Sequence, residues 1–335
     1  MKAIVYDKAG LPATDPASLY EIDVPTPEPG DTDLLVRIAA IAVNPVDTKL
    51  RAGVQPAGPR ILGWDGVGTV EQAGVGVTRF RKGDLVWFAG DLTRPGTYAE
   101  YTLVDERIAA LAPTSITAAE AAALPLTAIT AWELLFDRLR IGESGGRGES
   151  LLVIGAGGGV GSILVQLAAR LTGLTVIATA SRPETEAWVR GLGAHHVVDH
   201  TQPLQEQLAS LGFPAVDHVV SLTHTGQYYA QIVEVLKPQG QFALIDDPAT
   251  LDALPLKRKS ISLHWEFMFT RSMYRTDDMN KQHDLLARVA TLIDTGVLKT
   301  TLGENLGTID ATNLRKAHAL LESHRARGKL VLSGF

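Results

Sequence analysis

The stretch Leu151–Ser162, which reads LLVIGAGGGVGS, decides the fold of this chain. Its leading apolar residues, Leu151 to Ile154, are typical of a strand that is buried on both faces. A turn almost without side chains follows, and then an apolar helix that ends near Gly173. A strand, a glycine turn and a helix in this order aim backbone N–H groups and the positive end of a helix at a phosphate group.

The glycine turn provides the first candidate cofactor-binding residues, which are Gly155, Gly157, Gly158, Gly159, Val160 and Gly161. Glycine permits a positive φ and a close approach of the backbone to a pyrophosphate. A nucleoside-triphosphate loop requires Lys followed by Ser or Thr after its last glycine, whereas here Ser162 follows directly. Taken alone, the pattern also fits a tight strand–helix turn without a ligand.

The chain beyond residue 151 alternates short apolar runs with helical patterns, and this alternation predicts a doubly wound parallel sheet. In such sheets ligands bind at the carboxyl ends of the strands, which favours a dinucleotide at the glycine turn. The predicted strands are residues 151–154, 174–181, 195–200, 217–222 and 241–246.

The end of the second of these strands bears on the choice of dinucleotide. NAD-preferring sites usually carry an acidic residue there, which binds the ribose hydroxyls. This chain has Thr179-Ala180-Ser181-Arg182 instead. The hydroxyl of Ser181 and the planar donor fork of Arg182 suit a 2′-phosphate, which favours NADPH. The alternative is that Arg182 is a solvated surface arginine.

Composition limits the classes of function. The chain has 335 residues, of which 45% are hydrophobic and 20% charged, with a net charge of −6. This length predicts two domains, and the acidic balance gives no reason to expect a nucleic acid or a membrane surface as partner. The first residues contain early charges, and no apolar run approaches the ~20 residues of a membrane span. We therefore expect a cytoplasmic enzyme that acts on a small molecule.

The N-terminal part of the chain has a different pattern. Residues 1 to about 110 contain short apolar runs separated by turns rich in Pro, Gly and Asp, which predicts a small barrel or sandwich. Thr117 and Glu120 then fit a capping box that starts an alanine-rich helical segment, and Pro125 divides this segment in two. A closing helix–strand pair weakly indicates that the last strand returns to the first domain.

Several segments together resemble the medium-chain dehydrogenase/reductase superfamily: residues 43–53, 61–70, 96–101, 121–132, 155–162 and 328–332. The resemblance is to the quinone oxidoreductase branch, in the subgroup labelled zinc-type alcohol dehydrogenase-like proteins. It implies an α/β fold in which a GroES-like β-barrel catalytic domain, residues 1–124 and 265–335, encloses a Rossmann NADP-binding domain, residues 125–264, with a doubly wound parallel sheet. It also implies a homodimer.

The zinc in the subgroup's name requires ligands. Zinc-dependent members of the superfamily place a cysteine at the position of Asn44 and a His-Glu pair at the positions of Trp64 and Asp65. This chain contains no cysteine at all. Asn44 is a poor zinc ligand, and one carboxylate cannot hold zinc in the three-ligand arrangement of catalytic sites. We therefore predict an enzyme without a metal.

Without a Lewis acid, alcohol oxidation loses its usual means of lowering the pKa of the alcohol. Hydride addition to a quinone or to an α,β-unsaturated carbonyl is easier, because charge then builds on an oxygen that hydrogen bonds can hold. We hypothesise that Asn44 or Lys49 stabilises this oxyanion and that solvent or a Lys49-linked water supplies the proton. The alternative is that these residues form turns and caps. The candidate catalytic residues are Asn44, Asp47, Lys49 and Trp64.

By resemblance, further cofactor contacts fall to residues at strand ends and at the domain junction, although each also fits a core or loop role. Two other functions stay open. A zinc-type alcohol dehydrogenase would contain metal and oxidise simple alcohols, and a non-catalytic NADPH-binding protein would bind NADPH without turnover. The further contact residues are Thr130, Leu222, Thr223, Ile245, Phe269, Thr270 and Lys329.

Overall fold

The computed structural model describes residues 1–335, and the chain divides into two compact units. The first unit comprises Met1–Ile129 and Phe269–Phe335, and the second comprises Thr130–Met268. The end of the chain therefore belongs to the unit in which the chain begins.

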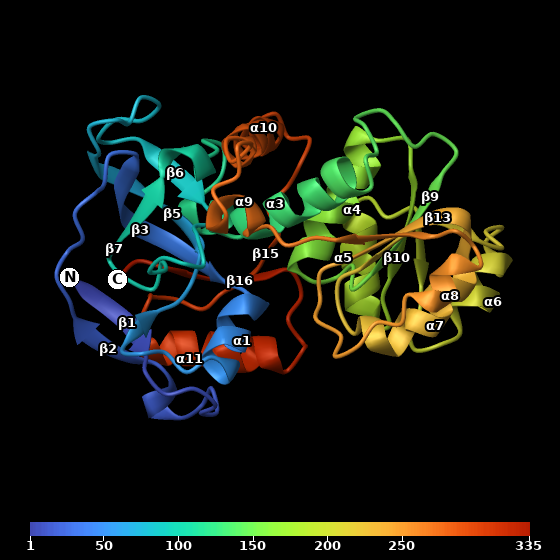
Figure 1. Cartoon of the computed structure of the whole chain (residues 1–335), viewed down its shortest axis with the longest axis horizontal. Helices are drawn as coiled ribbons and strands as arrows, with labels where there is room; N and C mark the ends of the chain where they lie inside the picture. The colour runs from blue at the N-terminus through green and yellow to red at the C-terminus, as the bar shows by residue number, and fades with distance from the viewer. The chain divides into compact units, whose positions relative to one another are not determined.

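The first unit is rich in β structure, as predicted, and Figure 1 shows its strands packed together with several helices around them. A small sheet has the strand order β2-β1-β4, from β1 (Lys2–Tyr6), β2 (Tyr20–Asp23) and β4 (Arg60–Ile61). A seven-stranded sheet has the order β15-β16-β3-β5-β6-β8, and β7 also pairs with β3. Its strands are β3 (Asp33–Val43), β5 (Asp65–Ala73), β6 (Leu85–Phe88), β7 (Tyr101–Asp105), β8 (Ala109–Leu111), β15 (Leu302–Asn305) and β16 (Lys329–Ser333).

The last strand, β16, pairs antiparallel with β3, with Leu330 opposite Val43 and Val331 opposite Ala42. Residues Leu330 to Leu332 are buried, so burial of apolar surface holds this strand in the sheet. The return of the chain that the sequence weakly indicated is therefore observed.

The helices of the first unit begin where the sequence provides caps. Thr117 and Glu120 form the predicted capping box, in which the Thr117 N–H donates to Glu120 Oε2 (2.8 Å) and the Glu120 N–H donates to Thr117 Oγ1 (3.3 Å). Helices α1 and α11 lie side by side (Figure 1). The helices are α1 (Pro45–Gly53), α2 (Ala118–Ala122), α9 (Thr270–Met273), α10 (Lys281–Asp294), α11 (Ala311–Glu322), the 3-10 turns Pro16–Ser18 and Glu106–Ile108, and α3 (Pro125–Trp132), along which the chain passes into the second unit.

The second unit contains the predicted parallel sheet, with six strands in the order β11-β10-β9-β12-β13-β14. The order reverses between β9 and β12, which is the switch point of a doubly wound fold. The predicted α/β class is thus confirmed, although β14 was not predicted. The strands are β9 (Ser150–Ile154), β10 (Thr175–Thr179), β11 (His196–Val198), β12 (Val216–Ser221), β13 (Leu236–Leu244) and β14 (Ser262–Trp265).

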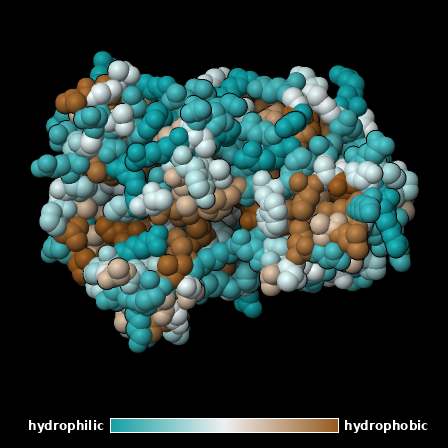
Figure 2. All heavy atoms as spheres, viewed as in Figure 1, coloured by the Kyte–Doolittle hydropathy of each residue, from teal (hydrophilic) through white to brown (hydrophobic).

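Helices connect these strands, and their apolar faces complete the core of the second unit. Leu152, Ile177, Val219 and Phe242 are fully buried in one cluster with apolar residues of the helices. Figure 2 shows a mostly hydrophilic surface that is interrupted by apolar patches. No helix of the structure combines the length and the apolar character needed to cross a bilayer. The helices are α4 (Gly159–Leu171), α5 (Pro183–Leu192), α6 (Leu204–Ser210), α7 (Thr225–Val235), α8 (Leu254–Lys257) and the π-helical turn Glu133–Arg138.

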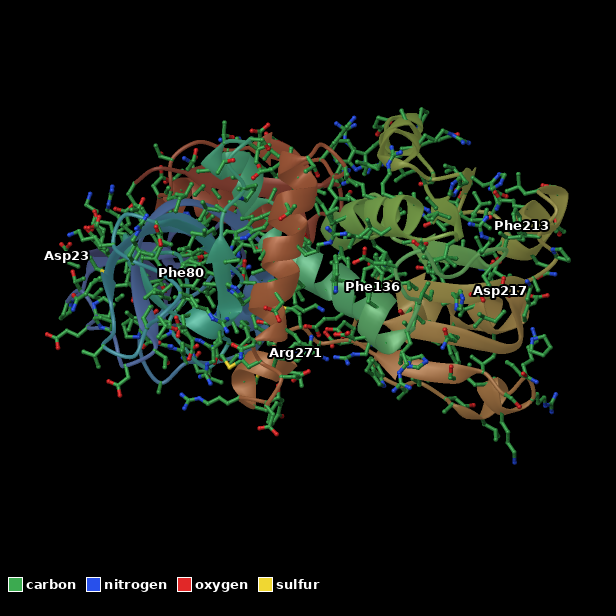
Figure 3. All side chains as sticks on the ribbon, turned by 90° about the horizontal axis from the view of Figure 1, so that it is seen from above. Asp23, Phe80, Phe136, Phe213, Asp217 and Arg271 are labelled. Atoms are coloured by element: carbon green, nitrogen blue, oxygen red, sulfur yellow. The ribbon has the colours of Figure 1, made fainter.

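The amino ends of the central strands are tied together by Asp217, which Figure 3 labels. The Asp217 carboxylate accepts hydrogen bonds from the backbone N–H and the hydroxyl of Ser150, both at 2.8 Å. It also pairs with the Lys237 ammonium at 2.8 Å. These contacts join β9, β12 and β13 at their amino ends, and the glycine turn lies at the opposite, carboxyl ends of the strands.

Candidate functional site

A buried polar cluster lies in the first unit where three strands begin or end. Asn44 directly follows β3, Asp65 begins β5 and Lys329 begins β16. The Asn44 amide donates from Nδ2 to Asp65 Oδ2 at 2.8 Å, and its Oδ1 accepts a short hydrogen bond from the Lys329 ammonium. We call these three residues the Asn44–Asp65–Lys329 cluster.

The Lys329 ammonium is the centre of this cluster. Its side chain is buried, with the whole residue only 3% exposed. Besides Asn44, it donates to Asp65 Oδ2 at 3.0 Å and to the Val43 carbonyl at 3.1 Å. Asp65 Oδ1 accepts the backbone N–H of Leu126 at 2.7 Å. A buried ion pair is expensive to desolvate, and hydrogen bonds to its remaining polar atoms offset that cost.

The residues at this position do not form a zinc site. No group of three or more His, Cys, Asp or Glu side chains in residues 1–335 is arranged to hold a metal ion. Asn44 and Asp65, at which the family resemblance places zinc ligands in other members, both accept hydrogen bonds from the Lys329 ammonium. The cation at this place is therefore part of the chain itself.

A second chain of hydrogen bonds reaches the backbone of Asn44 from the other side. Asp47 Oδ2 accepts the Asn44 N–H at 2.8 Å and the Tyr98 hydroxyl at 3.0 Å. The Tyr98 oxygen lies 3.1 Å from Nε2 of His318, and the Arg51 Nε–H donates to Nδ1 of His318 at 3.2 Å. We call these residues the Asp47–Tyr98–His318–Arg51 chain.

The arginine guanidinium can only donate hydrogen bonds, and this fixes the donor direction along the Asp47–Tyr98–His318–Arg51 chain. His318 Nδ1 accepts from Arg51, so in the neutral ring the proton is on Nε2, which donates to the Tyr98 oxygen. The Tyr98 hydroxyl proton then points to Asp47. Arg51 thus assigns both the tautomer of His318 and the donor direction of Tyr98.

Burial determines the protonation states along this chain. It raises the pKa of Asp47 to about 7, against the lowering effects of the Asn44 N–H, Tyr98 and Lys329. Burial, together with the charge of Arg51, lowers the pKa of His318 to about 3. Burial also raises the pKa of Tyr98. Asp47 is therefore the group in this chain that exchanges a proton near neutral pH, and its buried Oδ1 has no hydrogen-bond partner.

The other two candidate catalytic residues lie outside both groups. Lys49 is on the exposed side of α1. Trp64 is buried, its Nε1–H donates to the Asp91 carbonyl at 2.9 Å, and its ring meets the Phe269 ring edge-on at 6.0 Å. These contacts pack Trp64 against Phe269, and its catalytic role stays a prediction. Phe269 is buried as well, and Thr270 begins α9 beside it.

The glycine turn of the second unit has the geometry that the sequence indicates. Gly155 has a φ of +84°, and its N–H donates to Thr179 Oγ1 at 3.1 Å. A Cβ at Gly155 would lie 3.0 Å from Thr223 and 3.3 Å from Leu222, so these two residues border the turn. A Cβ at Gly161 would lie 2.5 Å from the Gly155 carbonyl oxygen, so only glycine lets α4 pack this closely. Gly157, Gly158, Gly159 and Val160 complete the turn and the first residues of α4.

The remaining candidates of the second unit also lie at carboxyl ends of its strands. Ser181 and Arg182 follow β10 and are exposed, and Arg182 is 3.6 Å from Glu184. Ile245 follows β13, and its N–H donates to the Ser221 carbonyl at 3.3 Å. Thr130 is buried on α3. Lys329 lies in the Asn44–Asp65–Lys329 cluster of the first unit, and its contact with a cofactor phosphate stays a prediction.

Several of these polar residues were missed from the sequence. The sequence indicates Asp65 only as a position for a metal ligand, and no pattern in it singles out His318 or pairs it with Arg51. Tyr98 lies in the segment 96–101 that contributes to the family resemblance, but a motif does not show which partner a hydroxyl binds. Arg51 and His318 are 267 positions apart, so only the packing of α1 on α11 brings them together.

The sequence matches two family models. Residues 30–114 match the alcohol dehydrogenase GroES-like domain, and residues 192–332 match a zinc-binding dehydrogenase model. A zinc-type alcohol dehydrogenase-like protein of Staphylococcus aureus is 43% identical over 320 residues, which cover 94% of each chain. The chain belongs to this family of the medium-chain dehydrogenase/reductase superfamily. The predicted superfamily, its quinone oxidoreductase branch and the GroES-like domain are thus confirmed, and the protein is an oxidoreductase.

Other members of the superfamily show the range of activities around this oxidoreductase. A chloroplastic quinone-oxidoreductase homolog of Spinacia oleracea is 38% identical over 66% of this chain and 67% of its own. A 2-methylene-furan-3-one reductase of Solanum lycopersicum is 30% identical over 93% of this chain and 74% of its own. A Rhizobium etli protein classed with zinc-dependent alcohol dehydrogenases has a crystal structure with a TM-score of 0.96 and 51% identity, covering 100% of this chain and 98% of that one.

Proposed function

We propose that this protein uses NADPH to reduce quinones or α,β-unsaturated carbonyls without a metal. The observation that carries the proposal is the Asn44–Asp65–Lys329 cluster, in which an ammonium group is bonded to the residues at the zinc-ligand positions. A soft conjugated acceptor needs hydrogen-bond donors for its developing oxyanion, and does not need a Lewis acid to lower the pKa of an alcohol.

The cofactor follows from the second unit. The glycine turn and the amino end of α4 suit a pyrophosphate, since backbone N–H groups and the helix dipole both favour anions. The end of β10 carries Ser181 and Arg182 and no carboxylate, which supports a 2′-phosphate and hence NADPH. When bound, this cofactor supplies the hydride. Leu222, Thr223 and Ile245, at neighbouring strand ends, support the adenosine and ribose.

Asn44 is the group that we assign to the substrate oxygen. Its Oδ1 is held by Lys329 and one N–H by Asp65, which orients the amide. The second N–H of the Asn44 amide has the Ala42 carbonyl as its acceptor, at 3.4 Å, which is a long and therefore weak hydrogen bond. This second N–H is the one that we expect to donate to the oxyanion of the substrate. Asp47 is a positioning residue, because it fixes the Asn44 backbone through the 2.8 Å hydrogen bond.

The proton that completes the reaction comes from solvent or from a water held by Lys49, which is exposed on α1. The names of two relatives agree with this substrate class, since a quinone and the carbonyl conjugated to an exocyclic methylene are both conjugated acceptors. The name of the Rhizobium etli protein favours the second candidate, a zinc-type alcohol dehydrogenase.

We also propose a homodimer. Strand β14 is at the edge of the parallel sheet, and an edge strand presents backbone N–H and C=O groups to a further strand. Trp265, at the end of β14, is 51% exposed and so presents a large apolar side chain to solvent beside this strand. Pairing of two copies through this edge would be isologous, with each β14 against the other.

One experiment separates the candidate functions. Purified protein, prepared without added metal, is assayed for loss of reduced-nicotinamide absorbance with NADPH and with NADH against quinones, enones, enals and saturated aldehydes. Simple alcohols are assayed with the oxidised cofactors, and zinc is measured by elemental analysis. We expect turnover of conjugated acceptors with NADPH and substoichiometric zinc. Stoichiometric zinc with alcohol oxidation would establish the second candidate, and NADPH binding without any turnover would leave a non-catalytic binding protein.

Asn44→Ala tests the assigned residue within the same assay. We expect kcat/KM for an enone to fall by about a hundredfold, the usual loss when one donor to a developing oxyanion is removed. Thr48→Ala is the control for local disturbance of the structure. It removes a hydroxyl near the start of α1 that donates a hydrogen bond to the Pro45 carbonyl. An equal effect of both changes would remove Asn44 from the proposal.

A further inference from the structure

Three loops at the carboxyl edge of the parallel sheet carry basic side chains. Ser181 and Arg182 follow β10, His200 follows β11, and His224 follows β12. The register places Thr179 of β10 opposite Val198 of β11, so these two strands end at the same level. The edge that holds the glycine turn therefore also collects one arginine and two histidines.

The electrostatics of His200 show that these groups act on one another. Burial lowers the pKa of His200, the charge of Asp199 opposes this, and the positive charges of His224 and Arg182 lower the pKa further. His200, His224 and Arg182 all follow carboxyl ends of strands in this sheet, so the three basic groups gather along one side of it.

The two imidazoles are held differently. His200 meets the ring of Tyr228 edge-on at 6.2 Å, and its Nδ1 is buried without a hydrogen-bond partner. His224 precedes α7, and its Nδ1 is 2.6 Å from Thr223 Oγ1. Thr223 also borders Gly155, so His224 contacts a residue that lies beside the glycine turn.

Three carboxylates face this region, and two of them are occupied by local hydrogen bonds. Asp199 accepts the N–H and the hydroxyl of Thr201 at 2.9 and 2.8 Å. Asp246 accepts the N–H of Thr225, the residue after His224, at 2.8 Å. Glu184 is 3.6 Å from Arg182 and exposed, so its side chain can move away when an anion binds Arg182.

We propose that His200 and His224 recognise the 2′-phosphate of NADPH together with Ser181 and Arg182, and that His200 makes this binding dependent on pH. This inference rests on the proposed use of NADPH. A phosphate beside the His200 imidazole favours the protonated ring, so NADPH binding takes up a proton in the pH range where the ring of His200 is neutral before the cofactor binds. NADH has a hydroxyl in place of the phosphate, and its binding should not be linked to this proton.

The direction of the effect follows from linkage. The free His200 has a pKa below its ordinary value, and a bound phosphate raises it. NADPH affinity should therefore increase as the pH falls from about 8 to about 6.5, by up to about tenfold per pH unit for each proton taken up. The phosphate itself gains a proton near pH 6, which weakens binding at lower pH. The two effects have opposite signs, so they can be separated.

The test is isothermal titration of the intact protein with NADPH and with NADH at several pH values, in two buffers of different ionisation enthalpy. The buffer pair gives the number of protons taken up per bound cofactor. We expect proton uptake at neutral pH with NADPH and none with NADH. His200→Gln should reduce the uptake and flatten the pH dependence of the NADPH-to-NADH affinity ratio, and His224→Gln should lower that ratio.

His196→Gln is the matched control, because His196 begins the same strand β11 and packs edge-on against Phe213 at 5.3 Å, on the outer part of the unit (Figure 3). It should leave proton uptake unchanged. A preference for NADPH without proton uptake, or uptake that His200→Gln retains, would overturn this inference alone. A lack of preference for NADPH at every pH would overturn the proposed cofactor and this inference with it.

Discussion

Replacing Lys329 by methionine tests the buried cluster most directly. The change keeps the length and apolar stem of the side chain but removes the ammonium that lies 3.0 Å from Asp65 Oδ2. Asp65 is fully buried, so its carboxylate then lacks the only cation that contacts it. Breaking a buried ion pair by removing one partner costs about 3–5 kcal/mol, because the other charge stays uncompensated. We expect Lys329→Met to lower the free energy of unfolding of the first unit by this amount.

The double variant Lys329→Met/Asp65→Asn separates the charge from the contacts. An asparagine at position 65 is neutral and keeps one acceptor oxygen, which can serve the Leu126 N–H. Its amide NH2 takes the place of Oδ2, so it can donate to Oδ1 of Asn44, which no longer accepts from Lys329. We expect it to recover most of the lost stability, since replacing both members of a buried pair is far less costly than removing one. Lys329→Arg keeps the charge and serves as the control.

The assay is urea unfolding at several pH values, followed by proteolytic sensitivity of segments in the first unit. In Lys329→Met the cost comes from a buried carboxylate charge without a partner, and acid removes that charge. The deficit should therefore be smallest in acid and grow as the pH rises. A deficit below about 1 kcal/mol, or one that is the same at every pH, would refute the account of the cluster.

Three further predictions concern single groups. Tyr98→Phe removes a hydrogen bond that lowers the pKa of Asp47. An apparent pKa near 7 in the pH profile of kcat/KM should therefore move upward. An unchanged profile would contradict the positioning role of Asp47. Burial and the nearby Glu133 raise the pKa of Glu266 to about 9, so the stability of the second unit should fall as the pH rises from about 4.5 to about 9. Glu266→Gln should remove this pH dependence in thermal unfolding curves. If the pH dependence persists in that variant, another group causes it. Arg182→Ala should weaken NADPH binding by about ten- to a hundredfold in a direct titration and leave NADH unchanged, and an equal loss for both would exclude a role specific to the 2′-phosphate.

The features that could be read from the sequence are those set by neighbouring residues. The glycine turn, the Thr117–Glu120 capping box and the alternation of strands and helices each depend on a few consecutive positions, and each is present in the structure. Ser181 and Arg182 could be placed at a strand end for the same reason. Such signals rest on backbone sterics and local hydrogen bonds, which act within a turn or two of the chain.

The polar groups of the first unit could not be read in this way. Lys329 and Asn44 are 285 positions apart, and Tyr98 and His318 are 220 apart. Their meeting depends on β16 pairing with β3 and on α11 packing against α1, and no local pattern specifies these contacts. Trp64 differs from these groups, because it lies in a local motif, whereas the sequence does not show that its side chain is buried against Phe269.

Asn44 is held at its side chain by the Lys329–Asp65 pair and at its backbone by Asp47, and of these groups Asp47 is the one that changes its charge near neutral pH. Lys329 and Asp65 form a paired cluster around its side chain, whereas Asp47, with a pKa of about 7, holds its backbone N–H. Protonation of Asp47 near neutral pH weakens the acceptor of that backbone hydrogen bond, while the contacts of the amide with Lys329 and Asp65 persist. A change in activity near neutral pH would then arise from the position of Asn44 and not from the charge of the cluster. In the proposed function, Lys329 provides the fixed positive charge beside Asn44, and Asp47 supplies the pH dependence of the reaction.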